Sequence, residues 1–145
     1  HWDPHARGLL HGITRDTQKG HIARAALEGI ALSVATLIDL AEEALSTSLG
    51  ELAVDGGAAA SDPLLQAQAD STGLKVRRPE SLESTARGVA LLAGVQANVI
   101  SSLESLISQR HENGKVFSPQ IDSKARKNWK NKWDDAVIRS LDWHG

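Results

Sequence analysis

The residues best suited to chemistry lie where a short apolar run meets a glycine pair. Leu52, Ala53 and Val54 are followed by Asp55-Gly56-Gly57, three alanines and a helix that restarts near Ser61. Glycine has no Cβ, so the backbone can turn sharply here and a flat ligand can lie close to it. The helix that follows presents free N–H groups and a positive dipole end, which suit a phosphate or another anion. Residues 55–61 are therefore the first candidate for a nucleotide contact, although Asp-Gly-Gly is also a common structural turn.

Three carboxylates could serve either chemistry or structure, two of them in or beside this turn and one in an earlier helix. Asp55 could act as a Mg²⁺ ligand or a base, or it could fix the turn through hydrogen bonds to its own backbone. Asp62 precedes Pro63 and is predicted to cap the second helix. Glu28 is predicted to pair with Arg24, four residues earlier on a helix. No catalytic residue is predicted from these patterns.

Histidines and basic residues suggest two further functions, and neither is predicted. His5, His11 and His21 lack the His-x-x-x-His spacing of a helical zinc site, so no metal ligand is predicted. The basic C-terminal stretch could resemble a nucleic-acid patch, but Asp134 and Asp135 follow it directly. Its tryptophans lie on a helical apolar stripe, so a docked helix with a solvated basic face is expected. The residues concerned are Lys124, Arg126, Lys127, Trp129, Lys130, Lys132, Trp133, Ala136, Val137 and Leu141.

Composition limits the broad class of the protein. The 145 residues suit one domain, and a net charge of −2 gives no field that would attract nucleic acid or anionic lipid. Cysteine is absent, which excludes disulfides and thiolate chemistry. No run of apolar residues approaches membrane-spanning length, so no membrane contact and a cytoplasmic location are expected. The chain starts at His1 with no initiator methionine, which suggests a piece of a longer protein.

Short apolar runs alternate with longer amphipathic ones, as is typical of an α/β domain. Strands are predicted at 7–14, 52–55, 74–78 and 116–117, and helices at 21–45, 61–71, 84–98, 102–109 and 122–143. The helix at 21–45 is expected to bury one stripe: Ile22, Ala26, Ile30, Val34, Leu37, Ala41 and Ala44. Small residues in the helix at 84–98 are expected to let it approach a sheet or another helix closely.

Longer motifs resemble a known family. Gly8-x-Leu10-x-Gly12-Ile13, followed after seven residues by His21-Ile22-x-x-Ala25-Ala26-Leu27-Glu28, is similar to the second signature of the FGGY carbohydrate kinases. The resemblance continues in register over essentially the whole chain and is strongest to the branch that acts on glycerol. The further matching segments are Trp2–Gly8, Val54–Gly57, Leu65–Asp70, Arg78–Gly94, Phe117-x-Pro119 and Trp133–Trp143.

This resemblance implies an actin-like ATPase domain of the ribonuclease-H-like type, with a mixed sheet flanked by helices. Residues 1–145 would be the later part of the C-terminal, nucleotide-binding domain. The N-terminal domain, which would bind the polyol and supply the base and the main Mg²⁺ ligands, lies outside this chain. ATP and Mg²⁺ are the implied cofactors. The implied nucleotide contacts are Gly56, Gly57, Ala58 and Ser61, on the adenosine side, and the fragment alone is expected to be inactive.

Two departures from the family pattern leave the substrate open. Ser61 stands where the glycerol branch usually has asparagine, and Ser33 where it usually has glutamine. Besides glycerol, a sugar or sugar acid such as xylulose or gluconate is therefore a possible substrate. A non-enzymatic actin-like nucleotide-binding module is the remaining alternative, and a homo-oligomer is compatible with each of these functions.

Overall fold

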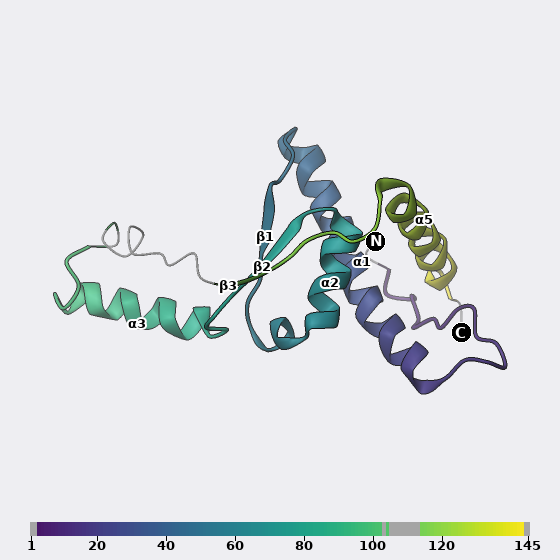
Figure 1. The fold of residues 1–145 in the computed structure, drawn as a ribbon, viewed down its shortest axis with the longest axis horizontal. Helices are drawn as coiled ribbons and strands as arrows, with labels where there is room; N and C mark the ends of the chain where they lie inside the picture. Colours follow the sequence, from purple (N-terminus) through teal and green to yellow (C-terminus); the bar gives the residue numbers. More distant parts are fainter. Residues whose placement is uncertain (1–2, 103, 105–113, 144–145) are drawn as a thin grey trace.

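The computed structural model describes residues 3–102, 104 and 114–143. The described chain contains a long helix α1 (Lys19–Leu45), a three-stranded sheet and two helices, α2 (Asp62–Thr72) and α5 (Ser123–Ser140), that pack with α1. Figure 1 shows these elements together, whereas helix α3 (Ser84–Gln96) extends away from them. The α/β class is therefore confirmed, with helices packed on a mixed sheet.

The sheet has the order β1-β2-β3, with β1 at Glu51–Ala53, β2 at Lys75–Pro79 and β3 at Gly114–Phe117. Strands β1 and β2 are parallel, with Leu52 opposite Val76, and α2 forms the crossover between them. Strands β2 and β3 are antiparallel, with Val76 opposite Phe117. This arrangement buries Val76 and Phe117 against Leu65 and Ala69 of α2 and forms one core.

A second core lies between α1, α2 and α5. Ala31 of α1 packs with Leu64 and Ala67 of α2, and half-buried Leu27 and Trp129 cover this cluster. The Ser71 hydroxyl is fully buried and donates to the Ala31 carbonyl oxygen at 3.2 Å. Small side chains allow the two helix backbones to approach closely, so α1 and α2 form one packed unit.

Helix α1 buries a different face from the one predicted. The buried residues are Ala31, Leu32 and Ala35, whereas Ile30 and Leu37 of the predicted stripe are 51% and 66% exposed. The periodicity misled because α1 is apolar on more than one side. The alanines offer the closest backbone approach, and it is this side that meets α2.

By length and composition alone, α1 is also apolar enough to cross a membrane, and 17% of its most apolar window is buried. The expectation that no apolar run approaches membrane-spanning length therefore did not anticipate this helix. The finding is weak evidence for a membrane, because the core helix of a globular protein meets the same criterion.

Two other sequence expectations differ from the structure. Residues 7–14 form an exposed loop rather than a strand, because no described strand pairs with them. The predicted helix at 102–109 falls almost wholly outside the described residues. The other predicted helices and strands are present within a few residues of their expected bounds.

Candidate functional site

The glycine turn connects β1 to α2 and forms a short 3₁₀ helix, η1, at Gly57–Ala60. It is tied at its start, because the Val54 N–H donates to the Arg77 carbonyl oxygen and the Gly56 N–H to that of Leu82, each at 3.0 Å. The predicted contacts Gly56, Gly57, Ala58 and Ser61 therefore form one continuous turn at the start of α2. The prediction that they bind a nucleotide stays a prediction.

The structure requires glycine at one of these two positions and not at the other. Gly56 has φ 79° and ψ 177°, a combination that is essentially restricted to glycine. Gly57 is not in the positive-φ region, and a Cβ built on it would meet nothing within 4 Å. The described part of the chain therefore explains the glycine at 56 but not the one at 57. An open approach to the backbone at Gly57 is what a ligand lying on the turn requires.

Ser61 directly precedes α2 and is half-buried. Its Oγ accepts a hydrogen bond from the Leu64 N–H at 3.4 Å, so Ser61 is the N-cap of the helix. The prediction that Asp62 caps this helix is wrong, because Asp62 is the first helical residue and its carboxylate bonds elsewhere. The Ser61 hydroxyl keeps its proton for a further acceptor.

The Asp62 carboxylate bridges two cations from neighbouring strands. Oδ1 accepts from Arg78 Nη1 at 2.8 Å, and Oδ2 from Lys115 Nζ at 2.5 Å. The hydrogen bond from Lys115, followed by that from Arg78, lowers the pKa of Asp62. Arg78 Nη1 also donates to the carbonyl oxygens of Ala59 and Ala60, at 2.9 and 3.3 Å. These bonds connect the end of the turn to β2 and β3.

The other candidate acidic residues behave differently. Arg24 Nε donates to Glu28 Oε1 at 2.6 Å, which confirms the predicted pair. The Asp55 side chain is exposed, and both of its proposed roles stay open. Within residues 3–102, 104 and 114–143, no group of three His, Asp or Glu side chains could hold a metal ion.

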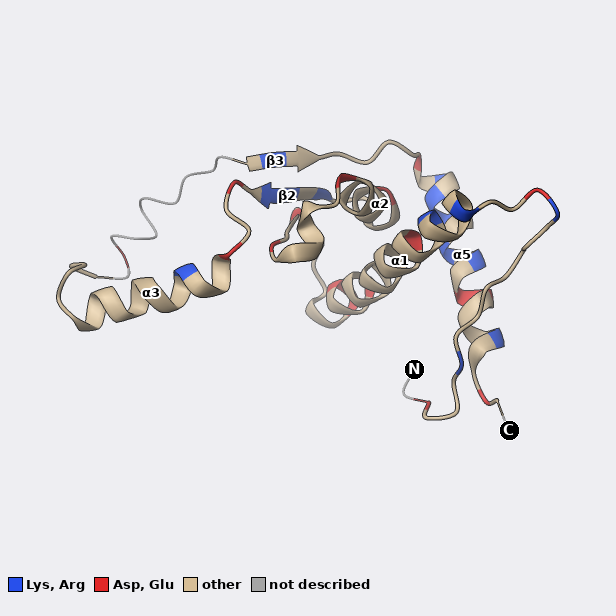
Figure 2. Cartoon of the chain, turned by 90° about the horizontal axis from the view of Figure 1, so that it is seen from below, with Lys and Arg blue, Asp and Glu red and all other residues tan. Residues whose placement is uncertain are grey.

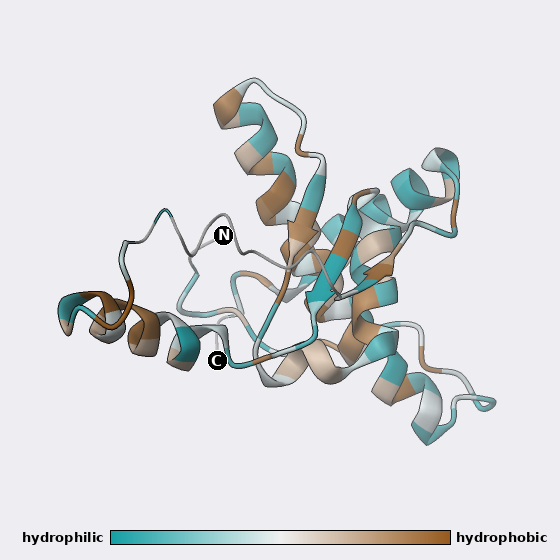
Figure 3. Ribbon diagram, turned by 60° about the vertical axis from the view of Figure 1, so that its left-hand side comes forward, coloured by the Kyte–Doolittle hydropathy of each residue, from teal (hydrophilic) through white to brown (hydrophobic). Residues whose placement is uncertain are grey.

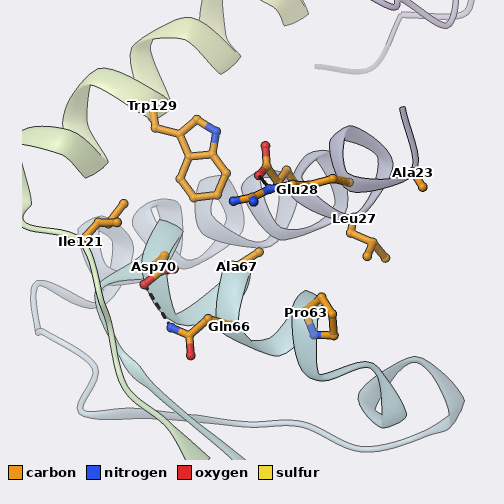
Figure 4. A pocket seen from close by; sticks show the side chains of 10 residues that line it. Ala23, Leu27, Glu28, Pro63, Gln66, Ala67, Asp70, Ile121 and Trp129 are labelled. Atoms are coloured by element: carbon orange, nitrogen blue, oxygen red, sulfur yellow. Dashed lines mark hydrogen bonds and ion pairs between the residues drawn. The ribbon is translucent and has the colours of Figure 1, made fainter. Parts of the chain in front are cut away.

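A cavity of about 640 Å³ lies between α1, α2 and α5, and none of the predicted nucleotide contacts lines it (Figure 4). Leu27, Pro63, Ile121 and Trp129 supply apolar walls, and the Arg24–Glu28 pair lies at its side. Sequence reasoning missed this cavity because its walls come from three helices far apart in the chain. Among the residues that line the cavity, Pro63 lies closest in sequence to the glycine turn, two residues after Ser61.

Helix α5 packs against α1 and α2 rather than standing free, in the arrangement expected for a docked helix. Its half-buried face includes Arg126, Trp129 and Trp133, whereas Lys124 and Lys127 are exposed. Lys130 bonds to Asp39 of α1, and Arg126 Nε donates to the Asp70 carbonyl oxygen at 2.8 Å. Figure 2 shows basic residues along α5 with acidic ones among them.

Comparison with known proteins defines the class. Residues 1–97 match the model of the FGGY family of carbohydrate kinases, C-terminal domain. The chain therefore belongs to the FGGY family of carbohydrate kinases.

Within the family, the chain is similar to several glycerol kinases. The chain is 46% identical to glycerol kinase 2 of Saccharolobus solfataricus and 44% identical to the glycerol kinase of Rhodopirellula baltica, each over 99% of its length. It covers 28% and 26% of those proteins, so it spans less than a third of their length.

Solved structures agree with this classification. A Plasmodium falciparum glycerol kinase with ADP matches 96% of the chain with a TM-score of 0.82 and 33% identity. A ligand-bound xylulose kinase from Lactobacillus acidophilus matches 95% with a TM-score of 0.68 and 26% identity. The chain covers 28% of each of these two proteins. Both likenesses extend over nearly the whole described fold, and they support its assignment to the actin-like ATPase type.

Proposed function

We propose that this chain is the nucleotide-binding part of a kinase that transfers the γ-phosphoryl group of ATP to glycerol and forms glycerol 3-phosphate. The similarity to glycerol kinases over 99% of the chain supports this substrate. The likeness to a glycerol kinase with ADP supports a nucleotide at this fold. An ATP-dependent reaction of this kind is expected in the cytoplasm.

The observation that carries the proposal is the open backbone at Gly57. A Cβ there would meet nothing within 4 Å apart from its chain neighbours, yet the residue is glycine and lies beside the N-terminus of α2. The adenosine side of ATP would lie on the turn, contacting the backbone of Gly56, Gly57 and Ala58 and the hydroxyl of Ser61. The turn keeps its shape because its ends are bonded to Leu82 and Arg78.

Phosphoryl transfer depends mainly on positioning and on neutralising charge, and bound Mg²⁺ would supply the neutralisation. The described residues offer no cluster that would hold this ion, so its ligands would come from the rest of the protein. The base and the polyol contacts would also lie there. The part played by this chain is to fix the nucleoside so that the phosphates extend toward the acceptor hydroxyl.

Another sugar kinase of the family is the second candidate. Ser61 and the likeness to xylulose and gluconate kinases favour it, although both of those structures are only 26% identical to the chain. A non-enzymatic nucleotide-binding module would keep the turn and lack turnover.

ADP formation by the full-length protein, measured with glycerol, xylulose and gluconate as acceptors, separates these functions. Turnover with glycerol at the highest kcat/KM is expected. A higher kcat/KM with another acceptor would support the sugar-kinase alternative. ATP binding without turnover on any acceptor would contradict the kinase proposal.

Gly57→Val in the full-length protein tests the turn itself. A branched side chain would occupy the space above the backbone, so the Kd for ATP should rise about tenfold or more, the effect of losing one well-placed polar contact. Gly50→Val is the matched control, because Gly50 is also open and lies before β1, away from the turn. Equal ATP affinity in both variants would remove the turn from the binding site.

A further inference from the structure

Arg78 reaches from β2 to the far end of the glycine turn. A single guanidinium nitrogen, Nη1, lies 2.9 Å from the Ala59 carbonyl oxygen, 3.3 Å from that of Ala60 and 2.8 Å from Asp62 Oδ1. The carbonyl groups at the end of a short helix have no partner within it, so a charged donor there fixes their direction. The guanidinium therefore bonds the end of η1 to the first residue of α2.

Lys115 joins this group from the next strand. Arg78 and Lys115 are direct partners in the antiparallel β2–β3 register, where two like charges would repel each other. The Asp62 carboxylate lies between them and accepts from both. Figure 2 shows the basic positions of β2 and β3 side by side. One carboxylate at the start of α2 thus holds two strands to the turn.

The Phe117 ring lies against both cations. The Arg78 guanidinium carbon lies 5.6 Å and Lys115 Nζ 4.9 Å from the centre of its ring. Both distances fit a cation–π contact. Phe117 is 6% exposed and packs in the core with Leu65, Ala69 and Val76. These side chains therefore connect the turn to the core of the sheet.

We propose that Arg78, with Lys115 acting through Asp62, is a positioning residue for the nucleotide-binding turn. Arg78 contacts the end of the turn, and both cations bond to Asp62, so that Gly57 and Ser61 are held in the geometry that receives the nucleoside. The inference rests on the proposed function, because it assigns the role to a turn that binds ATP. It predicts that losing Arg78 weakens ATP binding and leaves polyol binding unchanged.

The test compares Arg78→Met with Arg77→Met in the full-length protein. Arg77 is the neighbouring residue of β2, and its side chain pairs with Glu51 of β1 at 2.6 and 2.8 Å. Arg78→Met should raise the Kd and the KM for ATP about tenfold, as expected when charged hydrogen bonds to the turn are lost. The KM for glycerol should stay at the wild-type value in both variants, and Arg77→Met should bind ATP as the wild type does.

Two results of this comparison would overturn the inference and leave the proposed function intact. They are wild-type ATP affinity in Arg78→Met, or equal losses of ATP affinity in both variants. Lys115→Met covers the case in which Arg78→Met does not fold, since Lys115 is half-exposed. It should weaken ATP binding about threefold, because it acts through one carboxylate, and unchanged affinity would overturn the inference. Failure of the wild type to bind ATP would instead overturn the proposed function.

Discussion

Helices α2 and α3 are of similar length and follow neighbouring strands, yet they differ completely in burial. Helix α2 contains glutamines, aspartates and serine, but Leu64, Leu65, Ala67, Gln68, Ala69 and Ser71 are buried. Helix α3 is rich in alanine, valine and leucine, and none of its residues is buried. Figure 3 shows the apolar residues of α3 on a helix that stands apart.

The difference shows that neighbours, more than composition, decide burial. The sheet, α1 and α5 surround α2, so even the polar residues Gln68 and Ser71 are buried. The buried Gln68 Oε1 has no hydrogen-bond partner among the described residues, which is the cost of this placement. The small residues of α3 were expected to permit close packing with a sheet or another helix, but none of the described helices and strands packs extensively against α3. The candidate site is built on the packed helix.

The largest expected effect is at Leu65, which is 1% exposed in the core. Leu65→Ala in the 145-residue chain should lower the free energy of unfolding by about 2–5 kcal/mol, because it leaves a cavity beside Val76 and Phe117. Leu92→Ala in α3 removes the same atoms from a side chain that is 57% exposed. It should change stability by less than about 0.5 kcal/mol. Urea denaturation measures both values, and similar losses would show that α3 is packed in solution.

Glycine-to-alanine substitutions should have opposite signs in the two regions. Gly56→Ala should destabilise the chain by about 1–3 kcal/mol, because alanine avoids the φ of 79° found there. Gly88→Ala lies inside α3 with open space around it and should stabilise by about 1 kcal/mol. Thermal unfolding of the two variants tests the signs. A neutral Gly56→Ala would mean that the turn relaxes easily.

The smallest expected effect is a pH dependence from Asp62. Lys115 and Arg78 lower its pKa in the folded state, so the carboxylate stabilises the fold above its ordinary titration range, about pH 4. This contribution is lost as the pH falls through the lowered folded pKa. The difference in urea midpoint between the wild type and Asp62→Asn should therefore be constant near neutral pH and shrink below about pH 4.

Lys115→Met provides the control for this titration. It removes the largest cause of the shift, so substituting Asp62 in that background should give a smaller pH-dependent difference. A difference as large as in the wild-type background would mean that Lys115 does not contribute in solution.

Much of the fold was predictable because local patterns determine it. The long apolar periodicity gave α1, and turn residues separated β1, α2 and β2 within one or two residues of their observed bounds. The buried face of α1 was not predictable, because several of its faces are apolar and only the position of α2 selects one. The strand expected at 7–14 failed for a related reason, since a strand needs a partner and its own residues do not reveal one.

The candidate site, like the fold, was predictable only in part. Gly56 and Gly57 could be found from the sequence, because a glycine pair between an apolar run and a helix is typical of a strand–turn–helix connection. Arg78 and Lys115 could not, because they lie 16 and 53 residues from Asp62 and meet it only through the sheet. The one available signal was that Arg78 directly precedes Pro79 at a strand end, and this does not identify a partner. Asp62 was assigned to the wrong role because both Ser61 and Asp62 are good N-caps, and only the geometry chooses between them.

The order of strands also has a consequence for the chain while it is being synthesised. Strand β2 becomes central only when residues 114–117 pair with it, whereas β1, α2 and β2 are complete by residue 79. In the interval β2 is an edge strand, with unpaired backbone groups that could bind another chain. Arg77 and Arg78 place two positive charges on that edge, and charged side chains are a common protection against such pairing. Arg78, which bonds to the end of the finished turn, thus also contributes one of the two positive charges on this edge.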